Sequence, residues 1–103
     1  MSPLLSFDSD RLREFCTGWK ITELALFGSV LRDDFGPESD VDVLVAFAPQ
    51  ARWTLLDHVR MRDGLADLFG RDVDLVTRRA VEGSANYLRR REILSSAQVV
   101  YGS

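Results

Sequence analysis

The sequence predicts an α/β (α+β) domain in which a small mixed β-sheet is flanked by helices. Segments with apolar residues at helical spacing alternate with short, β-branched apolar runs along the 103 residues. The runs 40–47 and 71–77 are separated by a helix-length segment, and such a crossover connection predicts two parallel strands. The link from the run 21–27 to the run 40–47 is short and permits an antiparallel pair. The sheet is therefore expected to be mixed.

The first half of the chain is expected to hold two helices and two strands. In order, these are a helix over 9–19, a strand over 21–27, a short helix over 29–34 and a strand over 40–47. Asp8 or Ser9 provides a side-chain oxygen that caps the first helix. Gly36-Pro37 marks a turn before the second strand.

The second half is expected to repeat this alternation. Its elements are a helix over 55–69, a strand over 71–77, a helix over 84–95 and a short strand over 98–101. Thr54 is a typical helix cap, and Gly70 lies where a left-handed residue ends a helix. A chain of this length is expected to form a single domain over residues 1–103.

Composition narrows the class of function. The formal net charge is −3, which does not indicate electrostatic capture of nucleic acid. Cys16 is the only cysteine, so an intramolecular disulfide and a thiolate metal cluster are both excluded. The first 20 residues do not resemble a signal peptide, and no apolar run approaches the length of a membrane span. A cytoplasmic protein is expected.

Two aspartates interrupt the apolar run 40–47. Asp40 and Asp42 are two residues apart, so in a strand their carboxylates point to the same face. Two like charges about 4 Å apart repel by about 4 kcal/mol at an effective dielectric constant of about 20. Protons or a cation must offset this repulsion. Magnesium, which prefers oxygen ligands, is the cation that we expect.

A second Asp-x-Asp opens the run 71–77. If the two strands are parallel neighbours, Asp74 can join Asp40 and Asp42 in a carboxylate triad. Such a triad suits phosphoryl-type transfer, because two carboxylates hold a metal and the third takes the proton of an attacking hydroxyl or binds a second metal. Asp72 shares the face of Asp74, so the spacing leaves the choice between these two open.

A Gly-Ser pair precedes the aspartates. Gly28 allows a close approach of the backbone to a ligand, and the helix expected after Ser29 offers unpaired N–H groups to a phosphate. Taken alone, this signal is weak, since most Gly-Ser pairs are simply turns.

The segment from Leu26 to Phe47 resembles the signature of the DNA polymerase β nucleotidyltransferase superfamily: Gly28-Ser29, ten residues, then Asp40-x-Asp42. Its surroundings are similar to those of the minimal nucleotidyltransferases (MNT), small prokaryotic proteins that are often antitoxins of HEPN-domain toxins. The resemblance implies a polymerase β-like nucleotidyltransferase fold and runs from about Lys20 to Thr77.

The resemblance also implies roles for individual residues. Those for nucleotide binding are Gly28, Ser29 and Arg32; those for catalysis and metal binding are Asp40, Asp42 and Asp74. Asp74 would activate the acceptor hydroxyl. The implied reaction is Mg²⁺-dependent transfer of AMP from ATP to a tyrosine of a HEPN toxin, with release of pyrophosphate. Only 29 residues follow Asp74, which favours a protein partner as the source of the acceptor surface and hence a hetero-oligomer.

Two other functions stay open at this point. The chain could be a binding module that neutralises its partner by contact with little catalysis, although all three acids and the Gly-Ser pair favour an enzyme. Transfer to a small molecule or nucleic acid is disfavoured by the net negative charge. His58, the only histidine, is expected to be structural. Trp53 is expected to be a core or half-buried residue, with a place beside a nucleotide base or a partner as the alternative.

Overall fold

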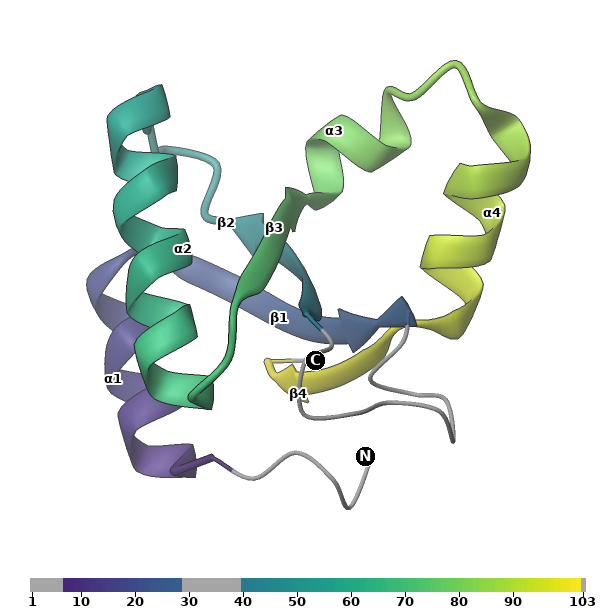
Figure 1. Ribbon diagram of the computed structural model, residues 1–103. Coiled ribbons are helices and arrows are strands. Elements are labelled where there is room, and N and C mark those ends of the chain that lie inside the picture. Colours follow the sequence, from purple (N-terminus) through teal and green to yellow (C-terminus); the bar gives the residue numbers. More distant parts are fainter. Residues whose placement is uncertain (1–6, 29–39, 103) are drawn as a thin grey trace.

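The computed structural model describes residues 7–28 and 40–102. They form one mixed sheet with helices on both faces (Figure 1). In chain order the elements are α1 (Ser9–Gly18), β1 (Ile21–Phe27), β2 (Val41–Phe47), α2 (Leu55–Phe69), β3 (Val73–Thr77), α3 (Arg78–Glu82), α4 (Tyr87–Ser96) and β4 (Gln98–Tyr101). The helix expected over 29–34 and the turn at Gly36-Pro37 lie outside the described residues.

The strand order in the sheet is β3-β2-β1-β4. β1 runs antiparallel to β2 and to β4, and β2 runs parallel to β3. This arrangement confirms the mixed sheet, because α2 provides the crossover that the parallel pair requires.

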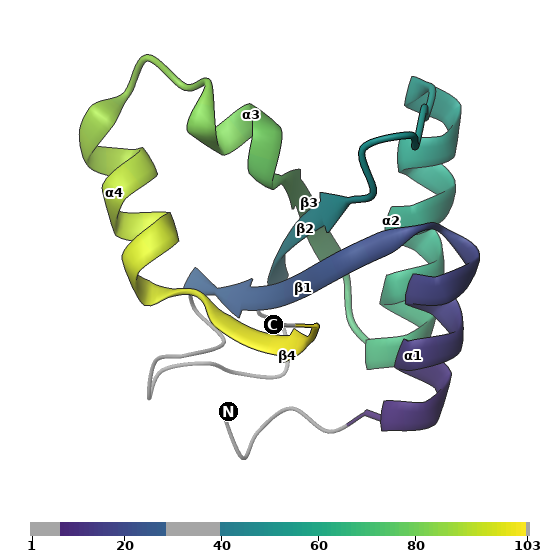
Figure 2. The ribbon, with the colours of Figure 1, turned by 180° about the vertical axis from the view of Figure 1, so that it is seen from behind.

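The helices divide between the two faces of the sheet. Figures 1 and 2 show α1 and α2 on one side, and α3 and α4 on the other. On the first side, α1 and α2 pack the larger core against the inward residues of β2, which are Val41, Val43 and Val45. On the second side, a smaller cluster forms around Ala25, Phe27, Leu44, Val81 and Ile93. Among the described residues, no helix has the length and apolar character needed to cross a bilayer.

The structure differs from the prediction at several element boundaries and by one additional helix. The third strand begins at Val73 instead of residue 71, because the N–H of Arg71 still donates to the carbonyl of Ala66 at the end of α2. The last helix covers Tyr87–Ser96 instead of 84–95, since the side chain of Asn86 accepts from the N–H of Arg89 and caps it there. The short helix α3 was not predicted.

The capping box of α2 contributes to stability. The Thr54 hydroxyl accepts from the Asp57 N–H, and the Asp57 carboxylate accepts from the Thr54 N–H at 3.0 Å. Thr54→Ala removes one of these bonds and is expected to lower the free energy of unfolding by about 1 kcal/mol. Chemical denaturation of the two proteins measures this difference. An unchanged midpoint would contradict it.

The capping carboxylate should make stability depend on pH at the acid end. The backbone N–H of Thr54 is the main cause that holds the pKa of Asp57 below its usual value; desolvation opposes it, and the Thr54 hydroxyl and Arg60 lower the pKa further. A lowered folded-state pKa stabilises the protein above the unfolded pKa of about 3.9, and this contribution disappears as the pH falls through the folded value. Asp57→Ala should therefore destabilise at pH 7, and its deficit should shrink in acid, as thermal melts at several pH values would record.

Cys16 is a core residue and should be chemically inert. It is fully buried in α1, and burial raises the pKa of its thiol to about 12. Because the thiolate is the reactive form, a thiol reagent should label the native protein far more slowly than the unfolded one. Labelling rates with and without guanidinium chloride test this expectation. Equal rates would show that α1 leaves the core readily.

Candidate active site

Asp42 and Asp74 lie side by side at the start of the parallel strand pair. The register of β2 and β3 places Asp42 opposite Asp74, one step after Val41 and Val73. Val41 and Val43 point into the core beneath α1 and α2, so the alternation of the strand sends Asp42 to the opposite face, with Leu44. The carboxylates of Asp42 and Asp74, which we call the acid pair, therefore lie on the face of the sheet that α3 and α4 partly cover. We call this the acid face.

The other two aspartates precede their strands. Asp40, Asp72 and Asp74 are all exposed, whereas Asp42 is half-buried. The Asp72 carbonyl accepts from the N–H of Val41 at 2.9 Å, which fixes Asp72 at the start of the parallel pair, two residues before Asp74. The register thus makes Asp74, and not Asp72, the neighbour of Asp42.

Gly28 brings backbone against the acid pair. Phe27, the last residue of β1, pairs with Asp42 across the antiparallel ladder, and Gly28 follows at a φ of 73°. A Cβ placed on Gly28 would overlap with the Oδ2 atom of Asp42. Only glycine fits here, both for its positive φ and for this close approach. The predicted nucleotide-binding residues Ser29 and Arg32 lie outside the described residues.

The carboxylate oxygens of Asp42 and Asp74 are the type of ligand that magnesium prefers. Magnesium is usually held by one or two carboxylates, with substrate phosphates and water completing the octahedron. The neighbouring carboxylates of Asp42 and Asp74 provide this minimum. Within residues 7–28 and 40–102, no group of three or more His, Cys, Asp or Glu side chains is arranged to hold a metal. The structure therefore gathers Asp42 and Asp74 but does not gather Asp40 with them into a three-ligand cluster.

Helix α3 covers part of the acid face, and sequence reasoning missed it. The Thr77 hydroxyl accepts from the Ala80 N–H and caps this five-residue helix. Arg78, its first residue, donates to the Glu23 carboxylate at 3.0 Å and so ties α3 to β1. A threonine at the end of a strand was the available signal, but a single helical turn has too little periodicity to be recognised.

A family profile described as Nucleotidyltransferase domain matches residues 10–100, nearly the whole chain. The chain belongs to this family. The profile spans the acid pair, Gly28 and the strands that carry them. The fold and the nucleotidyltransferase resemblance expected from the sequence are both confirmed.

Similar proteins support the assignment of the chain to this family. A "Putative protein adenylyltransferase" of Methanocaldococcus jannaschii is 36% identical over 64 residues, which are 62% of this chain and 63% of the relative. The chain thus matches less than two thirds of that relative's length. A solved structure described as a "putative minimal nucleotidyltransferase" is 36% identical, with a TM-score of 0.65, over 87% of this chain and 86% of the other.

A more distant structural neighbour is a chain in the structure of a tri-AMPylated Shewanella oneidensis HEPN toxin in complex with MNT antitoxin. It is 22% identical, with a TM-score of 0.62, and the match covers 92% of this chain and 70% of that one. At this identity the likeness shows a shared fold.

Proposed function

We propose that this nucleotidyltransferase-family chain is a cytoplasmic antitoxin that transfers AMP from ATP to a tyrosine of a cognate HEPN toxin. The observation that carries the proposal is the Asp42–Asp74 pair with the Gly28 backbone packed against it. The likeness to a protein named for adenylyl transfer and to a complex with an AMPylated HEPN toxin supports the choice of nucleotide and partner.

In the proposed reaction, the tyrosine oxygen of the partner attacks the α-phosphorus of ATP. The bond from that phosphorus to the oxygen bridging the α- and β-phosphates breaks, and pyrophosphate leaves. Asp74 accepts the proton of the tyrosine hydroxyl. Asp40 and Asp42 would hold magnesium, for which the Asp40 side chain would have to turn toward the acid pair, and Asp74 could bind a second ion; the metal would supply charge neutralisation on the phosphates.

The remaining roles concern the triphosphate. Gly28 and Ser29 would cradle it with backbone N–H groups, and Arg32 would contact a phosphate or brace the loop. A Cβ at Gly28 would displace the Asp42 carboxylate, so the glycine also preserves the position of the acid pair.

The test is direct. The chain is incubated with ATP, Mg²⁺ and the purified HEPN protein encoded beside it, and the intact masses of both proteins are recorded. A gain of one or more adenylyl units on the toxin, lost on addition of EDTA and lost when its acceptor tyrosine is replaced by phenylalanine, supports the proposal. Full neutralisation of the toxin with no mass gain would refute it and leave a module that acts by contact.

A further inference from the structure

A pocket of about 510 Å³ lies at the other end of the acid-bearing strands. Its walls include Phe47, Trp53, His58 and Met61, and its charged groups include Arg52 and Arg79. We call it the Trp53 pocket. Phe47 ends β2 five residues after Asp42, which is roughly 16 Å along a strand. The Trp53 pocket is therefore separate from the acid pair, and its size is typical of a binding site.

The charge of the Trp53 pocket is opposite to that of the chain. The formal net charge is −3, yet Arg52 and Arg79 line this pocket and no Asp or Glu does. Arg52 donates to the carbonyls of Pro49 and Ala51 at 3.1 Å, bonds that leave its positive charge unneutralised.

The consecutive arginines Arg78 and Arg79 differ in whether they form an ion pair. Arg78 is paired with Glu23 at 3.0 Å. Arg79 is exposed, and among the residues that the structure describes it forms no ion pair. Arg79 can therefore bind a carboxylate of a partner without first breaking an existing ion pair.

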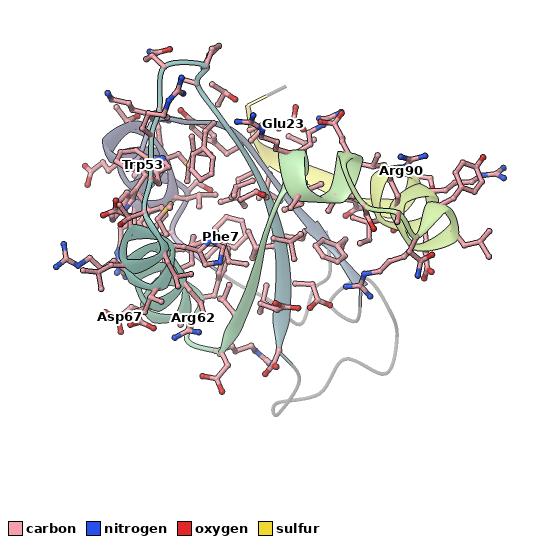
Figure 3. The ribbon with its side chains drawn as sticks, turned by 90° about the horizontal axis from the view of Figure 1, so that it is seen from above. Phe7, Glu23, Trp53, Arg62, Asp67 and Arg90 are labelled. Atoms are coloured by element: carbon pink, nitrogen blue, oxygen red, sulfur yellow. The ribbon has the colours of Figure 1, made fainter. Side chains whose placement is uncertain are left out.

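Trp53 adds an unused hydrogen-bond donor. Its ring packs edge-on against Trp19, with centroids 5.2 Å apart, and Figure 3 places it on the side of α1 and α2. Its Nε1 atom is buried and has no hydrogen-bond partner within the described ranges. Buried donors are rarely left unpaired, and an acceptor of an occupant could pair with this N–H once the ring turned toward the pocket.

Two exposed leucines indicate that the occupant is a protein. Leu55 borders the pocket and is 80% exposed, and Leu56 lies beyond its lining and is 59% exposed. A small molecule that fills the pocket leaves Leu56 exposed to water. A protein segment that crosses the pocket opening covers both Leu55 and Leu56. Aromatic and Arg side chains at the centre of an apolar patch are also typical of protein interfaces.

We infer that the Trp53 pocket docks an acidic segment of the protein that accepts the nucleotide. An apolar side chain of that segment enters the pocket, and its carboxylates contact Arg52 and Arg79. The identity of the partner rests on the proposed function. Docking at a distance from the acid pair holds the partner on the surface equally before and during the reaction, while the partner's own body presents its tyrosine to the acid pair.

Binding and transfer are measured separately with the HEPN protein. Arg79→Glu is expected to weaken binding by at least about tenfold, and Leu55→Ser by about threefold, because charge reversal repels the acidic segment and the serine removes apolar contact. The matched control is Arg13→Glu, an exposed arginine of α1 outside the pocket, which should change affinity by less than about twofold. Trp53→Phe keeps a ring but removes the N–H, and should also weaken binding.

The kinetic signature distinguishes docking from catalysis. In the pocket variants the KM for the partner should rise while kcat stays within about twofold, since the acid pair is untouched. Raising the salt concentration should weaken wild-type binding more than that of Arg79→Glu. If transfer fails even for the wild type, the proposed function falls, but the affinity series still tests the docking site.

Three results would overturn the inference. The first is an affinity for the partner that neither Arg79→Glu nor Leu55→Ser alters. The second is binding of AMP-PNP that the pocket variants abolish while partner binding is retained, which would assign the pocket to a nucleotide. The third is a wild-type dimer in sedimentation that Arg79→Glu converts to monomer, which would assign the face to a second copy.

Discussion

Asp42→Asn and Asp74→Asn are each expected to reduce adenylyl transfer by about 10²- to 10⁴-fold, the usual loss when a positioned acid–base group is removed. Asp42 and Asp74 are neighbours in the β2–β3 register, and the proposed chemistry needs both, Asp42 to hold the metal and Asp74 to accept the proton. Asparagine keeps the shape of the side chain, so both variants should fold.

The control for this pair is Asp72→Asn. Asp72 belongs to the same Asp-x-Asp sequence as Asp74, but the register places it two residues before Asp74, outside the acid pair. Its transfer rate should stay within about threefold of wild type, because surface substitutions away from a site have small effects. Mass spectrometry of the partner gives the rates, and thermal melts report folding. A full loss in Asp72→Asn with an active Asp74→Asn would assign the third acid to Asp72.

The strand pairing could be predicted because its causes are local or topological. The apolar runs 40–47 and 71–77 and the helix between them predict a parallel pair, and alignment of the two Asp-x-Asp sequences in such a pair brings Asp42 beside Asp74. Sequence spacing alone does not decide whether Asp72 or Asp74 is the neighbour of Asp42. A register shift of two residues would exchange Asp72 and Asp74 as the neighbour of Asp42, and register depends on contacts between strands.

Other parts depend on contacts distant in sequence and could not be predicted. The five-residue helix α3 is held by the pairing of Arg78 with Glu23, 55 residues away. The Trp53 pocket combines the end of β2, the start of α2 and the start of α3, which the sequence does not place together. His58 and Trp53 were interpreted as mainly structural because nothing near them in the sequence indicates a cavity.

The close approach at Gly28 leads to the second large effect. Gly28→Ala should reduce adenylyl transfer by about 100-fold, the loss expected when reacting groups are displaced by about 1 Å. The added methyl group would overlap with the Asp42 carboxylate, so either that carboxylate or the end of β1 must move. A residue with a Cβ at a φ of 73° also costs roughly 1–2 kcal/mol of stability.

Gly70→Ala separates these two effects. Gly70 has a φ of 70°, almost the same as Gly28, but a Cβ there meets nothing within 4 Å. Both variants should therefore lose a similar amount of stability from backbone strain, as denaturation curves would show. Only Gly28→Ala should lose transfer activity, because only there does the new methyl group contact the acid pair. Equal activity in the two variants would mean that the Gly28 backbone does not control the position of Asp42.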